Sequence, residues 1–171
     1  WKNLHDNLLG VGDGNIMAGD QQSYDIRHRV MIWYYAIFCY RLSGLIGYKP
    51  ADSRALYRAI MKSSRRIMII GGNIVLSTQG KDSGHVDTIF FNSIVLKLGI
   101  YYAFALDNKI QPGGLIEGRM CREFIRLAIT GDDNMMNVVD RYAMTGKRLQ
   151  DVFSSLGYVL TREDKSEAEI T

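Results

Sequence analysis

Apolar and polar positions along the chain follow the short period of strands in some segments and the longer period of helices in others. Short apolar runs at 15–19, 66–70 and 73–77 end at polar or glycine residues, which predicts strands. The second and third runs flank Gly71-Gly72, a two-residue connection typical of a β-hairpin. We therefore expect one early strand and one hairpin in the first half of the chain.

Longer segments with apolar residues on one broad face predict helices. The first covers 26–42 and is apolar enough to be heavily buried, and the second covers 51–63. Pro50 precedes the second segment, and proline is tolerated in the first turn of a helix. A third helical pattern runs over 84–106 before a Pro-Gly-Gly break.

The last third of the chain combines both patterns. Segments 124–129 and 134–139 flank a polar tip and predict a second hairpin, a helix over 145–156 with Thr145 as its cap follows, and 158–161 returns as a strand. Strands that alternate with helices favour an α/β or α+β layer with helices on one face of the sheet.

Composition limits the class of protein. The 171 residues are 47% hydrophobic and 23% charged, which fits one globular domain and excludes a disordered tail. The longest apolar run, over 30–40, is far shorter than the roughly 20 residues of a membrane-spanning helix, so we expect no transmembrane segment. Cys39 and Cys121 indicate neither a disulfide scaffold nor structural zinc. A chain that begins at Trp1 is expected to be a piece of a longer protein.

The net charge by itself says little about the function of the chain. The chain has 21 basic and 18 acidic residues, a formal charge of +3, which is too balanced to indicate nucleic-acid binding. We interpret Arg65-Arg66 and Lys147-Arg148 as solvated faces rather than RNA contacts.

Three aspartates occupy positions where strands end. Asp20 ends the first strand, and Asp132-Asp133 lie at the tip of the second hairpin. Two-metal phosphoryl transfer needs carboxylates that converge on two ions about 3.5–4 Å apart. If the two strands are neighbours in the sheet, all three carboxylates face one point. A Gly-Asp-Asp sequence taken alone is more often a plain hairpin turn.

Four patterns occur in one order along the chain. They are D-x-x-x-x-D at 20–25, S-G-x-x-x-T-x-x-x-N-S at 83–93, Gly-Asp-Asp at 131–133 and Asp-Lys at 164–165. This succession resembles motifs A to D in the palm of the RNA-dependent RNA polymerases of positive-strand RNA viruses, in particular the picorna-like group. The resemblance implies that 1–171 form the core of an α+β palm, with a small antiparallel sheet and helices packed on one face. It also implies that 26–82 contribute fingers-side structure and that the remaining fingers and the thumb are absent.

The resemblance also implies the residues of a metal site. Asp20 and Asp132 would bind two Mg²⁺ ions, for which Mn²⁺ is a possible substitute, and Asp133 would be the weaker or outer carboxylate. The backbone carbonyl of Gln21 would add an oxygen ligand. Lys165 resembles the motif D lysine that acts as general acid toward the leaving pyrophosphate.

A second group of residues is implied to bind the nucleotide. Asp25 resembles the ribose sensor that works with Ser83 and Asn92 on the 2′-hydroxyl, and Gly84 and Thr88 belong to the same motif. Thr88 and Asn92 are four residues apart, so on a helix they share a face.

The chain departs from the family pattern at several positions. Thr130 stands where tyrosine is common, Asp82 where proline is common, and Asp87 where close relatives often have glycine. None of these departures removes an expected metal ligand, but they leave the subgroup of polymerases open.

The implied function is RNA-templated RNA synthesis in viral genome replication. Its partners would be an RNA template, a nascent or primer strand, nucleoside triphosphates, and the fingers and thumb of the parent polymerase, in the host cytoplasm within a viral replication complex. The fragment alone is expected to be inactive.

Two alternatives remain. A reverse transcriptase palm uses similar carboxylates, but it normally has a bulky aromatic residue near the position of Asp25, and Asp25 and Asn92 argue against it. A catalytically silent palm-like scaffold or RNA-binding module is the other, and Asp20, Asp132 and Lys165 make it the weaker hypothesis.

Overall fold

The elements of the fold follow the order expected from the sequence, with one additional helix at the start. The computed structural model describes residues 2–10, 16–21, 31–77, 87–109, 123–139 and 144–162. The elements in these segments are α1 (Lys2–Leu9), β1 (Ile16–Gln21), α2 (Met31–Leu45), α3 (Pro50–Ser63), β2 (Arg66–Ile70), β3 (Asn73–Ser77), α4 (Thr88–Asp107), β4 (Ile125–Thr130), β5 (Asp133–Val138), α6 (Gly146–Ser155) and β6 (Leu160–Thr161).

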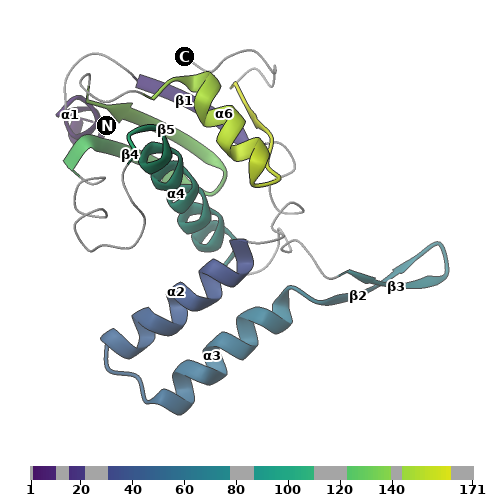
Figure 1. Cartoon of the computed structure of the whole chain (residues 1–171). Coiled ribbons are helices and arrows are strands. Elements are labelled where there is room, and N and C mark those ends of the chain that lie inside the picture. Colours follow the sequence, from purple (N-terminus) through teal and green to yellow (C-terminus); the bar gives the residue numbers. More distant parts are fainter. Residues whose placement is uncertain are drawn as a thin grey trace.

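Four strands form an antiparallel sheet in the order β4-β5-β1-β6 (Figure 1). β1 therefore lies between β5 and β6, although β5 and β6 come much later in the chain. Gly19 pairs with Asn134 of β5, and Asp20 pairs with Thr161 of β6. This order confirms the small antiparallel sheet and makes the first strand a neighbour of the second hairpin.

The hydrophobic core lies between the sheet and the helices α4 and α6, and it continues into α2 and α3 (Figure 1). The helices α4 and α6 and the strand β5 contribute side chains that are completely buried in this core. They include Phe91, Phe104, Met136, Leu149 and Phe153. A Cβ atom on Gly99 of α4 would lie 2.7 Å from the ring of Phe153, so only glycine lets the two helices approach this closely.

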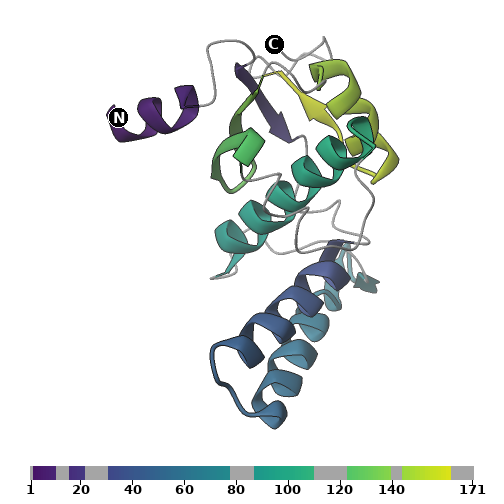
Figure 2. The same ribbon diagram turned by 60° about the vertical axis from the view of Figure 1, so that its left-hand side comes forward.

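The helices α2 and α3 form a pair that extends away from the sheet, and the β2–β3 hairpin continues from the end of α3 (Figures 1 and 2). The buried side of α2 reaches α4 through Tyr35, whose ring meets the ring of Phe91 edge-on with centroids 4.6 Å apart. This contact anchors the helical pair to the first turns of α4.

Most predicted elements are confirmed, with shifts at their ends. The first hairpin has the predicted strands 66–70 and 73–77, and α3 has the predicted extent. The second hairpin has a two-residue turn rather than the four-residue tip that we expected. Asp20 lies at the end of β1 as expected, and pairing with β6 extends the strand by one more residue, to Gln21.

The predicted cap of α6 is also confirmed. The Thr145 hydroxyl accepts a hydrogen bond from the Arg148 backbone N–H at 3.2 Å, and Gly157 ends the segment with φ of 86°. The sequence pattern did not predict α1. This helix lies beside β4 and β5, where the side-chain amide of Asn137 donates a hydrogen bond to the Leu8 carbonyl at 2.7 Å.

Among the described helices, α4 alone has the length and hydropathy of a membrane span. Nine of its residues are buried, and it packs against β4 and α6. The core helix of a folded domain has the same composition, so its hydropathy is weak evidence for a membrane segment.

Candidate functional site

The backbone around Asp20 is held from both sides of β1. The side-chain amide of Asn134 on β5 donates a hydrogen bond to the Gly19 carbonyl at 2.8 Å. The hydroxyl of Thr161 on β6 donates one to the Asp20 carbonyl at 3.3 Å. These two bonds fix the backbone of β1 at Asp20. The residue is buried, with 6% of its surface exposed.

The turn between β4 and β5 is tied to α4. Thr130 pairs with Asp133, which leaves Gly131 and Asp132 as the two turn residues, and Gly131 has φ of 67°. The Gly131 backbone N–H donates a hydrogen bond to the Ser93 hydroxyl at 2.9 Å. That hydroxyl in turn donates to the Ile89 carbonyl at 2.7 Å. The helix therefore sets the position of the turn.

Ser93 is a residue of the site for which sequence reasoning found no role. It is the last position of the S-G-x-x-x-T-x-x-x-N-S pattern, so the signal was present in the sequence. Its hydrogen-bond partner, Gly131, belongs to the Gly-Asp-Asp motif, and no local sequence pattern connects Ser93 with Gly131.

Asp20 and Asp133 line one open pocket of about 400 Å³. Its other lining residues come from β1, β4 and β5, and they are Gly19, Ala128, Thr130, Asn134 and Met135. Because Gly19 pairs with Asn134, continuing the same antiparallel register sets Asp20 opposite Asp133. Directly opposed residues project to the same face of a sheet. Two carboxylates from neighbouring strands therefore share this pocket.

Asp132 occupies a different position. It is exposed at the second residue of the turn and does not line the pocket, whereas Asp133, the expected outer carboxylate, does. In the described part of the chain, no group of three or more His, Cys, Asp or Glu side chains is close enough to hold a metal ion. The roles of Asp132 and Asp133 in metal binding remain predictions.

The donor set of the pocket fits Mg²⁺. Mg²⁺ prefers hard oxygen ligands, retains several waters, and is often bound by only one or two carboxylates together with substrate phosphates. Asp20 and Asp133 supply two carboxylates at an open pocket that leaves room for water and phosphate. A cage of three or four protein ligands is not required for such an ion.

Two of the predicted nucleotide residues lie on the first turns of α4. Thr88 and Asn92 have 6% and 4% of their surface exposed, and their spacing sets them on the same face of the helix as predicted. The remaining predicted residues, Asp25, Ser83, Gly84 and Lys165, lie outside the described residues.

Gln21 has a buried side chain that the hydrophobic core does not explain. Only 2% of its surface is exposed, and within the described segments neither atom of its amide has a hydrogen-bond partner. Leaving an amide in this state costs about 1–3 kcal/mol. The resemblance implies a role for the backbone carbonyl of Gln21, and the buried side chain is a further polar group next to Asp20.

Two neutral side chains support the start of α4 from α2. Burial raises the pKa of the Tyr35 hydroxyl above its usual range, and burial also raises the pKa of the Cys39 thiol. Both groups are therefore uncharged at neutral pH. Tyr35 contacts Phe91, the residue before Asn92, edge-on. Because Tyr35 is neutral, this contact places no charged side chain next to Asn92.

Comparison with known proteins concerns the family and the fold. A family model described as viral RNA-dependent RNA polymerase matches residues 42–171. A solved structure, the Sicinivirus 3Dpol RNA-dependent RNA polymerase, has a similar fold with a TM-score of 0.63 and 17% sequence identity. The match covers 90% of this chain and 30% of that one. No curated protein sequence matches significantly. The family match extends over most of the chain, and the chain therefore belongs to the viral RNA-dependent RNA polymerase family.

Proposed function

We propose that this chain is the catalytic palm of an RNA-dependent RNA polymerase. Family membership supports the activity, and the resemblance to 30% of a full polymerase supports a role as one part of a larger enzyme. Motifs A to D and part of the fingers would lie within 1–171, and the remaining fingers and the thumb would come from outside these residues.

The observation that carries this proposal is the shared pocket of Asp20 and Asp133. The two residues are far apart in the sequence, yet antiparallel pairing of β1 with β5 brings both carboxylates to one open pocket. An isolated Gly-Asp-Asp turn has no reason to lie beside a buried aspartate from another strand. In a nucleotidyl transferase this arrangement has a function, because the enzyme must hold divalent ions at the triphosphate.

In the proposed reaction, the 3′-hydroxyl of the growing RNA strand loses its proton to water and attacks the α-phosphorus of a nucleoside triphosphate. A new bond forms between O3′ and phosphorus, and the bond to the β-phosphate oxygen breaks to release pyrophosphate. When bound, two Mg²⁺ ions would favour ionisation of the attacking hydroxyl and neutralise charge on the leaving group. Asp20, Asp132 and Asp133 would hold them, and Mn²⁺ could replace Mg²⁺.

Other residues of the chain would move a proton and select the sugar. Lys165 would donate a proton to the leaving pyrophosphate as general acid. Asp25, Ser83 and Asn92 would bind the 2′-hydroxyl, with Gly84, Thr88 and the Gln21 carbonyl at the same nucleotide. The burial of Thr88 and Asn92 on one face of α4 supports this group.

The proposed partners are an RNA template, its nascent or primer strand and nucleoside triphosphates. We further propose that the polymerase works in the host cytoplasm, within a viral replication complex. Replication of an RNA genome requires these partners, and membership of the viral polymerase family supports them.

Primer extension by the polymerase that contains this segment tests the proposal. Asp20→Asn and Asp133→Asn should each lower the rate of incorporation by about a thousandfold, because metal binding contributes several kcal/mol to the transition state. Asp151→Asn is the matched control, since Asp151 is an exposed carboxylate that pairs with Lys147 on the surface of α6. A wild-type rate in Asp20→Asn would contradict the proposal.

The same assay separates the alternatives. Comparing Asp132→Asn with Asp133→Asn shows whether the reaction needs one or both carboxylates of the second hairpin. Parallel reactions with deoxyribonucleotides test for a reverse transcriptase, and a wild-type enzyme that incorporates neither kind of nucleotide would indicate a silent scaffold.

A further inference from the structure

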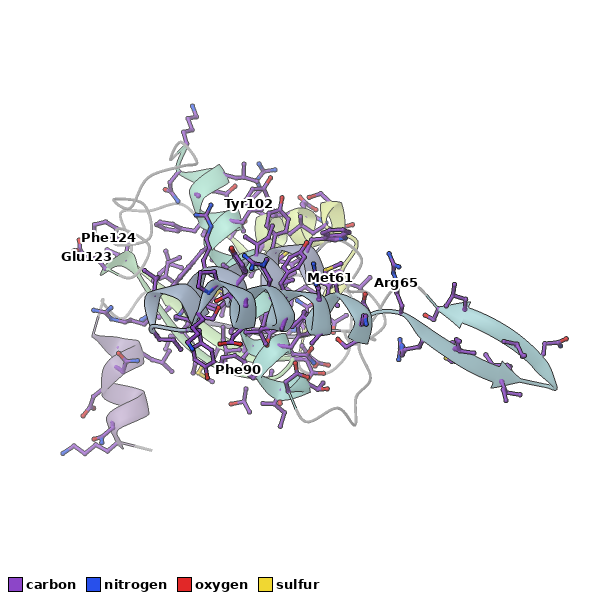
Figure 3. The ribbon with its side chains drawn as sticks, turned by 90° about the horizontal axis from the view of Figure 1, so that it is seen from below. Met61, Arg65, Phe90, Tyr102, Glu123 and Phe124 are labelled. Carbon is purple, nitrogen blue, oxygen red and sulfur yellow. The ribbon has the colours of Figure 1, made fainter. Side chains whose placement is uncertain are left out.

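A second pocket lies on the helical pair, away from the sheet and its carboxylates. This groove has a volume of about 270 Å³, and it is lined by Trp33 of α2, by four residues of α3 and by Arg65, which follows α3. The four α3 residues are Tyr57, Arg58, Met61 and Lys62. Met61 and Arg65 project to the same side of α3, and Arg65 extends from the end of the helix (Figure 3). We refer to these six residues as the α2–α3 groove.

The groove lies in the most basic part of the chain. Residues 49–66 include six basic side chains and one acidic side chain, a net charge of +5, whereas the whole chain has +3. The rest of the chain is therefore net negative. Positive charge is concentrated on α3 and the residues that flank it, which the overall balance of 21 basic and 18 acidic residues conceals.

The basic residues form a line along α3. Arg54, Arg58 and Lys62 are spaced by four residues, so they lie on one face of the helix with about 6 Å of rise between neighbours. Arg65 continues this line at the end of the helix. A regular row of cations suits a polyanion with regularly spaced charges better than it suits a single anion.

These cations are exposed and available. In the described segments, no acidic side chain forms an ion pair with Arg58, Lys62 or Arg65, whereas Arg148 and Lys147 pair with Asp107 and Asp151 on the other side of the molecule. When such side chains neutralise the phosphates of a nucleic acid, the cations condensed on its backbone are released, and this release adds to the affinity.

The groove also offers an aromatic surface. Trp33 is 51% exposed, which is unusual for the largest apolar side chain, and it lies beside the half-buried Tyr57 and Met61. A nucleic-acid base can stack on an aromatic ring, and proteins that bind single strands combine such rings with a cationic groove. A duplex keeps its bases inside, so an exposed tryptophan favours a single strand.

We propose that the α2–α3 groove binds single-stranded RNA, with phosphates on Arg58, Lys62 and Arg65 and a base stacked on Trp33. This revises the expectation that Arg65 belongs to a merely solvated face. The choice of RNA over DNA rests on the proposed function, but the binding itself needs neither metal nor nucleotide. The groove can therefore fail its test while the polymerase proposal holds.

Fluorescence anisotropy of the full chain with a labelled oligouridylate of about 12 nucleotides, a length within known single-strand site sizes, tests the charge component. EDTA in the buffer excludes binding that depends on metal at the carboxylates. The double variant Arg58→Gln, Lys62→Gln should weaken binding at least about tenfold. It should also lower the slope of log affinity against log salt by about 1.4, since each lost phosphate contact on a single strand contributes roughly 0.7.

A matched double variant controls for total charge. Lys2→Gln with Lys147→Gln removes two exposed lysines outside the groove and lowers the net charge equally. It should bind almost as the wild type does. Equal weakening by the two double variants would overturn the proposal, because binding would then depend on overall charge alone.

Trp33→Leu tests the stacking component. It keeps an apolar side chain, should weaken binding about 5- to 100-fold, and should leave the salt slope unchanged, whereas Trp33→Phe should keep most of the affinity. A thermal unfolding curve for each variant verifies the fold. Binding of polyglutamate as tight as that of the oligouridylate, with no effect of Trp33→Leu, would overturn the proposal and indicate an acidic protein partner. Equal binding of oligodeoxyuridylate would overturn the choice of RNA.

Discussion

The Ser93 hydroxyl accepts a hydrogen bond from the Gly131 backbone N–H at 2.9 Å, so α4 holds the turn that precedes Asp133. Ser93 belongs to the motif that contains Thr88 and Asn92, and Gly131 belongs to the Gly-Asp-Asp motif. One hydrogen bond thus connects the helix with the proposed nucleotide residues to the hairpin with the proposed metal residues. This contact adds to the packing of α4 on β4, which also sets the relative position of the two motifs.

Replacing Ser93 with Ala should loosen the turn. The variant loses one hydrogen bond, which costs about 0.5–1.5 kcal/mol of unfolding free energy, and the Gly131 amide should exchange with solvent faster. Hydrogen exchange measured by NMR reports the amide directly. Ser93→Thr keeps a hydroxyl and should restore slow exchange, and an unchanged Gly131 exchange rate in Ser93→Ala would mean that the contact does not hold the turn.

Gly131→Ala should destabilise the chain through the backbone alone. Gly131 has φ of 67°, and no described atom lies within 4 Å of the position of an added Cβ, so strain rather than collision sets a cost of about 1 kcal/mol. Gly44→Ala is the matched control, because Gly44 lies inside α2 with equally open surroundings. The control should be neutral or stabilising by up to about 1 kcal/mol, as measured by urea unfolding.

Asn92→Ala should reduce the preference of the polymerase for ribonucleotides. A site built to bind a hydroxyl discriminates against an analogue without it, because its own polar groups are then left without partners. The measurement is the ratio of kcat/KM for a ribonucleotide to that for the matching deoxyribonucleotide. Asn108→Ala, at the other end of α4, controls for the loss of an amide on the same helix. An unchanged ratio in Asn92→Ala would indicate a purely structural amide.

The stability of the chain should fall above about pH 10. Burial raises the pKa of Tyr158 above its ordinary value near 10, so above that pH the unfolded chain releases a proton that the folded chain retains. The free energy of unfolding then decreases by up to about 1.4 kcal/mol per pH unit for this group. Tyr158→Phe should flatten the dependence measured between pH 9 and 11, roughly, in urea titrations. Tyr34→Phe, at a 58% exposed position, should leave it unchanged.

Local sequence by itself determined the elements whose pattern is complete within a short stretch. The Gly71-Gly72 hairpin and α3 have the predicted bounds, because turn residues, a leading proline and side-chain periodicity all act within a few positions. The succession of motifs was also sufficient to indicate the polymerase family, which the family match then showed independently.

Tertiary structure alone decided which of these residues meet. Pairing with β6 extends β1 past Asp20, and the register between β1 and β5 brings Asp133 rather than Asp132 into the pocket. A shift of one residue would reverse this choice, and the chain between the strands does not encode the register locally. In the same way, Trp33 lies on α2 and Arg65 follows the end of α3, and only the packing of α2 on α3 brings them into one groove.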